Sequence, residues 1–431
     1  MSSTQKFSRR QLLKRASAAG AAIAVPWIVP SSVFGANAPS NRIVMGSIGV
    51  GGMGTGNTLN FLGMGDVQLV AVCDVDRRHR EHMKHEIDGK YGNKDCRTYL
   101  DFREMLEKEK LDALTTALPD HWHAIPVIAA ARKRIDIYGE KPLARSIKEG
   151  RAMCDAVQAC GCVWQTGSWQ RSSGDFRRAA ELVINGRIGK VSRAIVGLPG
   201  GTAGRPYPPV QAPPPYLDWN LWLGPAPWRP YSAFGGDDGP HGDWRWIMDY
   251  SGGQLTDWAG HHIDIAHWGL GFDHTGPVEI AGSAVYPEDG IYDVPGDYHF
   301  ECTYANGVVI DVSNANRMGT TWHGDKGWVY VDRDGFDAEP KSLLKEVIGT
   351  DEIKLYESDD HHRNFIECVK SRKLTITPIE TAYRSISVGL LGEIAMLTGR
   401  KIRWNPDTEE ILADPAASAL LGRAYRAPWS L

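Results

Sequence analysis

The chain has 431 residues, of which 42% are hydrophobic and 23% charged, and it contains 15 Trp. This length is enough for two domains with sizeable cores, and this composition excludes a disordered chain. The formal net charge of −4 argues against nucleic acid and anionic membrane surfaces as partners. Seven cysteines at irregular spacings predict no disulfide framework.

Residues 1–38 have the features of a twin-arginine (Tat) export signal. The pair Arg9-Arg10 precedes an apolar run over 16–29, and residues 36–38 read Ala-Asn-Ala, as at a cleavage site. The run is too short and too interrupted by proline to span a bilayer in the mature protein. We therefore expect a periplasmic or otherwise exported protein without an integral membrane span, and uncleaved anchoring remains an alternative. Cleavage would remove five basic residues and no acid, which leaves a net charge of −9.

A glycine-rich turn organises the segment 39–165. An apolar run from Ile43 leads into Gly49-x-Gly51-x-x-Gly54, and a helix-compatible stretch, Thr58 to Leu62, follows. Glycine is needed there for a tight turn, for close backbone approach to a pyrophosphate and for helix-to-strand packing. The same turn contains Gly52 and Met53, which we include among the cofactor-binding residues. The alternative is an ordinary glycine-rich surface loop.

Later residues support the cofactor interpretation. A second apolar run, 67–73, ends at Asp74, an acid twenty residues after Gly54 that suits the ribose hydroxyls of NAD. Arg77 and Arg78 lie close enough to accept a 2′-phosphate, so NAD is favoured and NADP is the alternative. Short strands then alternate with helices to about residue 162, which predicts a doubly wound parallel sheet.

The loop after the strand 111–118 is also a candidate for the ligand crevice, because it follows the carboxyl end of a parallel strand. It supplies Pro119, His121 and His123 as cofactor-binding candidates, with capping of the next helix as the alternative. The helix expected over 77–91 carries three His residues at three-residue steps. Its many charged neighbours favour a solvated face over a metal site, and we predict no metal.

The strand 135–139 is followed by Glu140-Lys141-Pro142. A Glu-Lys-Pro after the fifth strand of a dinucleotide domain resembles the Gfo/Idh/MocA oxidoreductases. The resemblance implies that Lys141 reaches both the nicotinamide and the substrate hydroxyl and that Glu140 borders the cofactor. It also covers Trp244-Arg245-Trp246 and the stretch Asp257 to His262, motifs of exported members of the family.

Members of that family carry an Asp with a His four residues later as a proton-transfer pair, which Asp257 and His261 match. On one continuous helix these two residues and Asp264 would share a face. The reference pKa of a histidine, near 6.5, makes His261 the best available base, with Asp257 expected to hold its tautomer and Lys141 to stabilise the alkoxide. Here Ala259 stands where many members have Gly, so either His261 or His262 would face the substrate.

Candidate substrate contacts come from two stretches. The family resemblance places the turn with Trp169, Gln170 and Arg171 beside the active site. The segment 199–253 is rich in Pro, Gly and Trp, and such a long irregular segment is usually functional. Its tryptophans, among them Trp246, either line a carbohydrate groove or pack the loop together. His262 completes the substrate set.

We expect an α/β Rossmann dinucleotide-binding domain (39–165) plus an α+β domain (166–378) with a large, mostly antiparallel open sheet. Residues 379–431 should form a C-terminal helix and tail that pack back on the first domain. The predicted function is an NAD(P)-dependent oxidoreductase for a carbohydrate or polyol hydroxyl, with a tightly bound, recycled cofactor and a homo-oligomeric state. An NAD-dependent glycoside hydrolase and a catalytically silent sugar-binding protein are the alternatives.

Overall fold

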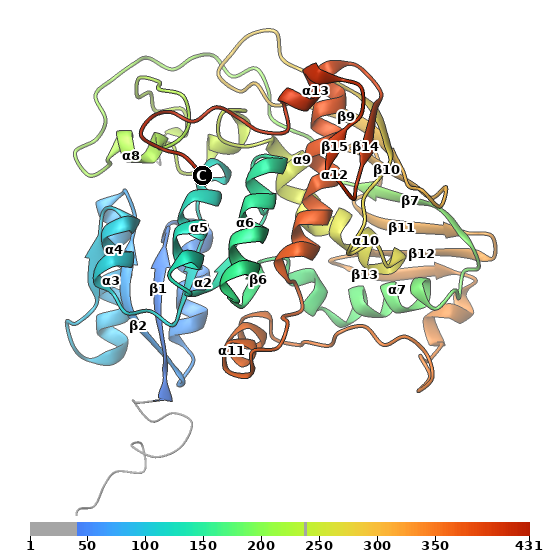
Figure 1. Ribbon diagram of the computed structural model, residues 1–431, viewed down its shortest axis with the longest axis horizontal. Coiled ribbons are helices and arrows are strands. Elements are labelled where there is room, and N and C mark those ends of the chain that lie inside the picture. The colour runs from blue at the N-terminus through green and yellow to red at the C-terminus, as the bar shows by residue number, and fades with distance from the viewer. Residues whose placement is uncertain (1–40, 237–238) are drawn as a thin grey trace, which may run out of the picture. The chain divides into compact units, whose positions relative to one another are not determined.

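The computed structural model describes residues 41–236 and 239–431, so the candidate export signal 1–38 lies outside the described residues. Six parallel strands form the first sheet, in the order β3-β2-β1-β4-β5-β6 (Figure 1). This arrangement confirms the predicted Rossmann fold. The order of the strands reverses between β1 and β4, and ligands of such sheets bind at the carboxyl ends of the strands at that point.

The strands of this sheet are β1 (Ile43–Ile48), β2 (Val67–Cys73), β3 (Arg97–Tyr99), β4 (Ala113–Thr116), β5 (Asp136–Gly139) and β6 (Trp164–Thr166). Their connecting helices are α2 (Gly52–Leu62), α3 (Arg77–Tyr91), α4 (Phe102–Lys108), α5 (Ala124–Arg132) and α6 (Ile147–Cys160).

Local sequence explains where these helices begin and end. The Asp76 side chain caps α3 by accepting from the backbone N–H of Arg78, and Gly92 ends that helix with a φ of +67°. Helix α2 begins six residues before the expected stretch, at Gly52, because the glycine turn itself forms its first turn.

A second sheet of nine strands follows in the order β13-β12-β11-β7-β10-β9-β8-β14-β15. All neighbouring pairs are antiparallel except β7 with β10, which are parallel. This confirms the expected large, mostly antiparallel sheet. Its strands are β7 (Val191–Gly197), β8 (Glu279–Val285), β9 (Asp297–Thr303), β10 (Val309–Ser313), β11 (Gly319–Gly324), β12 (Gly327–Asp332), β13 (Gly335–Glu339), β14 (Ile402–Asn405) and β15 (Glu410–Ile411).

The remaining helices are α7 (Gly174–Ile184), α8 (Trp219–Leu223), α9 (Gly253–Trp258), α10 (Asp264–Leu270), α11 (His361–Ser371), α12 (Ile379–Thr398) and α13 (Pro415–Ala419). None of the helices among the described residues combines the length and apolar character needed to cross a bilayer.

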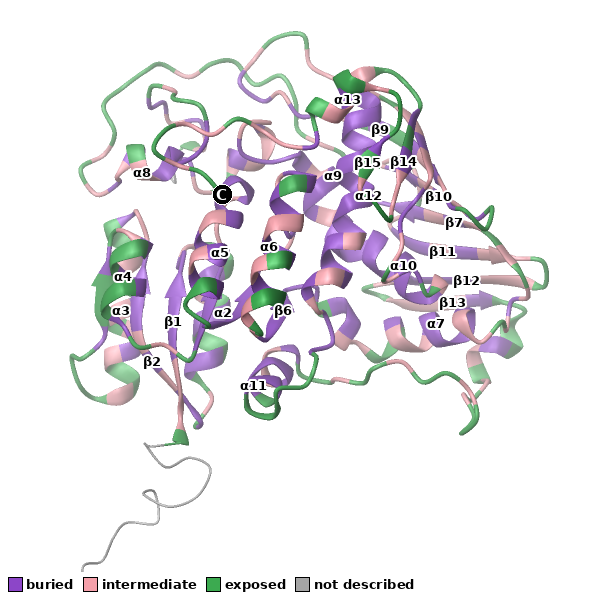
Figure 2. Cartoon of the chain, in the orientation of Figure 1, coloured by how far each residue is buried: buried purple, intermediate pink, exposed green. Residues whose placement is uncertain are grey.

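Helix α12 lies between the two sheets, beside α6 on one side and β8 on the other (Figure 1). It is buried along most of its length (Figure 2), which explains why its sequence is apolar on nearly all sides. Arg151 of α6 pairs with Glu380 of α12 at 2.9 Å. Helix α12 thus contacts α6 of the first domain, while the strands that follow it, β14 and β15, extend the second sheet.

The Pro- and Trp-rich insertion, residues 199–253, has a small core of its own. Trp219, Trp222 and Trp244 are buried in it together with Phe234 and Tyr250. All three thus pack the loop together, and Trp222 and Trp244 also line the cleft described below.

A buried histidine gives the fold a pH dependence. His267 in α10 is fully buried, its Nε2 lies 2.6 Å from the Tyr304 hydroxyl, and burial lowers its pKa to about 4. The unfolded chain takes up a proton at this residue near the ordinary pKa of about 6.5, so stability is present above that pH and is lost as the pH falls toward about 4. We expect the stability advantage of the wild type over His267→Gln to shrink by about 2 kcal/mol between neutral pH and about pH 5. Urea unfolding of both proteins at the two pH values measures this, and a pH-independent difference would contradict it.

Candidate active site

The glycine turn after β1 packs directly against the backbone of the segment that follows β4. Gly49 has a φ of +77°, and a Cβ there would lie 2.3 Å from the carbonyl oxygen of Ala117. A Cβ on Gly54 would lie 1.9 Å from the carbonyl oxygen of Gly49. Glycine is therefore required at both positions. Helix α2 starts at this turn without a side-chain cap, so its first N–H groups remain available for an anion such as a pyrophosphate.

Asp74 lies at the end of β2 beside this turn. Its carboxylate accepts from the backbone N–H of Val50 at 2.9 Å and from that of Asp76 at 2.8 Å. A cleft begins here and extends to Glu140 and Lys141 at the end of β5. The predicted cofactor residues that line it are Gly49, Gly51, Gly52, Met53, Gly54, Asp74, Pro119, Glu140 and Lys141. The cleft thus runs along the carboxyl ends of β1, β2, β4 and β5, as a bound dinucleotide requires.

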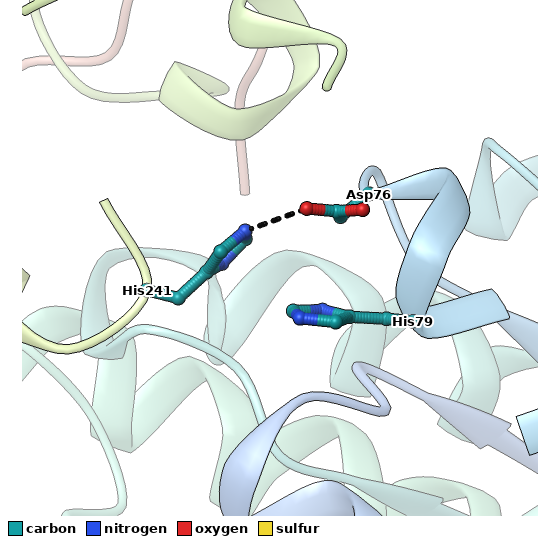
Figure 3. A group of neighbouring side chains, drawn as sticks. All are labelled: Asp76, His79 and His241. Carbon is teal, nitrogen blue, oxygen red and sulfur yellow. Dashed lines mark hydrogen bonds and ion pairs between the residues drawn. The ribbon is translucent and has the colours of Figure 1, made fainter. Parts of the chain in front are cut away.

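Asp76, His79 and His241 form a cluster at the Asp74 end of the cleft. Figure 3 shows His241, from the insertion, reaching Asp76 at 3.1 Å, with the ring of His79 beside it at 4.5 Å between ring centroids. One carboxylate and two imidazoles are a plausible set of metal ligands. Both Asp76 oxygens, however, already accept from Arg78, whose positive charge opposes a cation. The cluster therefore acts as a clasp between α3 and the insertion.

The other end of the cleft contains a buried ion pair. Lys141 Nζ donates to Asp257 Oδ1 at 2.9 Å, and each side chain is only 11% exposed. Arg245 Nε lies 3.4 Å from the same oxygen. Burial alone would raise the pKa of Asp257, but Lys141 and Arg245 outweigh it and lower that pKa. The carboxylate is therefore ionised at neutral pH and holds both cations at the end of the cleft.

His261 lies near this pair, in a π-helical turn, Ala259–Ile263, that separates α9 from α10. Burial and the charges of Lys141 and Arg333 hold the pKa of His261 well below its usual value, so the ring is neutral. Its Nδ1 is buried and has no hydrogen-bond partner in the part of the chain described here. A neutral imidazole beside a lysine can accept a proton from a bound hydroxyl or donate one to it.

The comparisons with known proteins identify both domains. Residues 43–168 match the family model "Oxidoreductase family, NAD-binding Rossmann fold", and residues 202–431 match "Oxidoreductase family, C-terminal alpha/beta domain". The second match alone covers more than half of the chain. The protein belongs to the Gfo/Idh/MocA oxidoreductase family. Its first domain is accordingly an NAD-binding domain.

Several family members resemble parts or most of the chain. A myo-inositol 2-dehydrogenase of Thermotoga maritima is 30% identical over 34% of this chain and 42% of the relative. A scyllo-inositol 2-dehydrogenase (NAD⁺) of Bacillus subtilis is 22% identical over 83% of this chain and 94% of the relative. A glycosyl hydrolase family 109 protein of Solibacter usitatus is 30% identical over 33% and 35%. The chain therefore matches less than half the length of the two relatives that share 30% identity.

A solved structure shares the whole fold. The scyllo-inositol dehydrogenase of Lactobacillus casei, with bound NAD(H) and scyllo-inositol, superposes with a TM-score of 0.58 at 15% identity. The superposition covers 84% of this chain and 99% of that protein. At this identity the match establishes the Gfo/Idh/MocA fold and not the substrate.

The loop after β4 carries three of the predicted cofactor-binding residues. Pro119 lines the cleft, whereas His121 and His123 do not. Both ring nitrogens of His123 lie against backbone carbonyls, of Pro142 at 2.7 Å and of Leu118 at 2.8 Å. His121 Nε2 lies 3.2 Å from the carbonyl of Trp222 in the insertion. These contacts tie the loop after β4 to its neighbours, and contact of His121 or His123 with the cofactor stays a prediction.

The expectation that Asp257, His261 and Asp264 share one helix face was wrong. The π turn inserts a wider helical turn and changes the direction of the side chains that follow. Asp264 pairs instead with Arg171, and no hydrogen bond joins Asp257 to His261 among residues 41–236 and 239–431. Asp257 therefore orients Lys141 directly. The sequence had led us to expect that Asp257 would hold the tautomer of His261.

The predicted substrate residues occupy different environments. Trp169 is 41% exposed, and Gln170, oriented so that its nitrogen donates to the His261 carbonyl at 3.1 Å, lies beside the site. His262 Nδ1 lies 2.8 Å from the Gly197 carbonyl oxygen on β7 and 3.2 Å from Gly319 N on β11, and the tautomer of the ring decides which of the two it pairs with. Trp246 is half-buried against the core of the insertion. Substrate contact by these residues remains a prediction, and Gln170 and His262 are both almost fully buried.

Sequence reasoning missed three residues. Arg245 had a signal, because it lies inside the Trp-Arg-Trp motif, but its ion pair with Asp257 was not foreseen. Arg333, in the turn between β12 and β13, stacks on the rings of Trp169 and Trp258. Trp429 lines the cleft from the C-terminal tail. Nothing local in the sequence marks the last two, because only tertiary folding brings them to the site.

The glycine turn yields a matched pair of variants. We expect Gly54→Ala to cost about 1–3 kcal/mol through overpacking against the Gly49 carbonyl, and to lower NAD binding because the turn must shift. Gly56→Ala lies in the same helix, where an added Cβ meets nothing within 4 Å, and should be neutral or slightly stabilising. Chemical denaturation and NAD titration of the two variants test this, and equal behaviour would contradict it.

Arg171 allows a test of a structural role against a substrate-binding role. Its side chain is 2% exposed and pairs with Asp264 at 2.7 Å and with Asp273 at 2.8 Å. We expect Arg171→Met to lower the free energy of unfolding by about 3–5 kcal/mol, because two buried carboxylates lose their partner. Adding Asp264→Asn should recover part of that loss in urea unfolding. Unchanged stability with a raised KM would instead mark Arg171 as a substrate contact.

Proposed function

We propose that the protein is an NAD-dependent oxidoreductase that oxidises a hydroxyl of a sugar or polyol, holds its cofactor tightly and works after twin-arginine export. The observation that carries the proposal is the buried Lys141–Asp257 pair, with neutral His261 nearby, at one end of a cleft that fits a dinucleotide. Family relatives named as inositol dehydrogenases support the substrate class.

When bound, NAD supplies the acceptor for the hydride that leaves the carbinol carbon. The chain's own residues handle the hydroxyl proton. Lys141, fixed by Asp257, provides a positive charge for the developing alkoxide. His261 is neutral, so one of its ring nitrogens is unprotonated and can take up the proton. The nearby lysine weakens His261 as a base, so its proton is passed on readily to solvent or to a second substrate.

Two segments that are distant in sequence, the insertion and the C-terminal tail, support tight binding, because they cover the cleft. The insertion pairs with the backbone after β2, where Arg77 N donates to Tyr216 O and Asp218 N donates to Val75 O. Arg426 of the tail holds the insertion through Asn220, and Trp429 lines the cleft beside it. Release of the cofactor then requires several of these contacts to open together.

NAD is favoured over NADP by the groups around Asp74. The Asp74 carboxylate would repel a 2′-phosphate. Arg78, a candidate to bind that phosphate, is paired with Asp76 at 2.8 Å and lies over the ring of Tyr216. Asp76 therefore already neutralises the charge of Arg78.

The cofactor itself gives the first test. We expect the purified mature protein, when acid-denatured, to release stoichiometric NAD, identified by absorbance and mass. Release of NADP would overturn the choice of nucleotide. Protein that is empty and fails to bind added NAD would overturn the oxidoreductase proposal.

Catalysis is tested by replacing the two groups that handle the proton. We expect Lys141→Met and His261→Gln each to lower kcat by roughly 10²–10⁴, the usual size of acid–base assistance, with sugar binding retained. Lys133→Met is the control, since Lys133 lies on the surface and pairs with Glu107. Retained kcat in both variants would overturn the roles given to Lys141 and His261. A wild type that binds sugar without any turnover would instead identify a catalytically silent binding protein.

An NAD-dependent glycoside hydrolase is the second candidate, favoured by the relative in glycosyl hydrolase family 109. Such an enzyme would cleave a chromogenic glycoside without net reduction of its cofactor. Release of the chromophore that depends on Lys141 would select this candidate, whereas net oxidation of a free sugar would select the dehydrogenase.

A further inference from the structure

The substrate end of the cleft has more positive than negative charge. Lys141 and Arg245 both lie within 3.4 Å of Asp257. Arg333 is close enough for its charge to act on His261 and for Asp257 to act on it. Three cations thus lie near one ionised carboxylate. The other acids nearby, Glu140 and Asp120, are buried, burial raises the pKa of each, and they accept from Asn57 and Ser251 respectively.

Arg333 is held in a fixed orientation without an acidic partner. Its guanidinium lies 4.8 Å from the ring centroid of Trp169 and 4.5 Å from that of Trp258. Its Nε donates to the Gln170 side-chain oxygen at 3.3 Å, and Gln170 in turn donates to the carbonyl of His261. The two indoles and the amide therefore orient the planar group before any ligand arrives, which lowers the entropic cost of binding one.

The acids that neighbour Arg333 in sequence do not neutralise it. Asp332 accepts from the Tyr330 hydroxyl and from the backbone N–H of Asp334. No carboxylate among residues 41–236 and 239–431 lies within ion-pair distance of Arg333, and neither of its terminal nitrogens has a hydrogen-bond partner there. An arginine left without an acid beside an active site, and partly exposed, is available for a ligand.

We propose that Arg333, assisted by Arg245, forms a subsite for a carboxylate of the substrate, so that the protein acts on a sugar acid. This inference rests on the proposed oxidoreductase function. A guanidinium offers two parallel N–H groups that match the two oxygens of a carboxylate. The indoles that stack on the guanidinium hold it in the orientation that this pair needs. A carboxylate at Arg333 also brings the charge of this end of the cleft closer to balance.

The test uses the holoenzyme and paired probes, methyl glycosides of glucuronic and galacturonic acid together with their methyl esters. Each pair has the same hydroxyls and differs only in the charge at one carbon. Binding is measured by calorimetry and reduction of the bound cofactor by its absorbance. We expect at least one acid to be preferred over its ester by roughly 10- to 100-fold in Kd or KM.

Variants assign that preference to Arg333. Arg333→Gln should abolish the preference for the acid, and Arg333→Lys should keep part of it. Arg317→Gln is the matched control, because Arg317 also stacks on an aromatic ring, Tyr330 at 3.4 Å, and should leave the preference intact. A preference for the acid that survives Arg333→Gln would overturn the subsite.

The outcomes separate this proposal from the one on which it rests. Acids that bind through Arg333 without reducing the cofactor would sustain the subsite and overturn the oxidoreductase function. Neutral sugars oxidised regardless of Arg333 would sustain the function and overturn the subsite. No binding of any acid, or stronger binding of a sugar phosphate than of the acids, would also overturn it.

Discussion

The ion pair between Lys141 and Asp257 is the constraint on which the rest of the site depends. Lys141 follows the last residue of β5 in the first domain, and Asp257 lies in α9 of the second, so the pair fixes the end of the cleft. Burying two charges is costly unless their geometry is good and both remain paired. Every element that orders either residue therefore also orders the site.

Small residues around this pair show how closely it is packed. A Cβ on Gly260 would lie 3.1 Å from the Cβ of Lys141, so this glycine lets the π turn approach the lysine. Ala259 occupies the position at which the family resemblance led us to expect glycine. Its methyl group has room because α12 has Gly389 opposite, where a Cβ would lie 3.0 Å away. Gly389 on α12 thus makes room for Ala259, so this departure from the family pattern causes no clash that would turn His261.

The cleft joins two different kinds of chemistry. At the Asp74 end, fixed backbone groups and the hydrogen bond between Asp76 and His241 suit a ligand that stays bound. At the Lys141 end, a neutral histidine and an excess of cations suit a ligand that arrives with its own charge and leaves again. This division fits the proposal of an exported oxidoreductase that retains its cofactor and exchanges its substrate.

The sequence by itself determined the local and periodic features. Glycine spacing, strand periodicity and the Glu-Lys-Pro and Asp-x-x-x-His motifs predicted the Rossmann sheet, the antiparallel sheet and the residues Lys141, Asp257 and His261. These features depend on backbone sterics and on residues close in the chain. Only the tertiary structure decided which of them meet. Asp264 follows the π turn and pairs with Arg171, and Asp257 pairs with Lys141. The turn between β12 and β13 places Arg333 beside the indoles of Trp169 and Trp258. Such contacts depend on how separate elements pack, and no local pattern in the sequence encodes them.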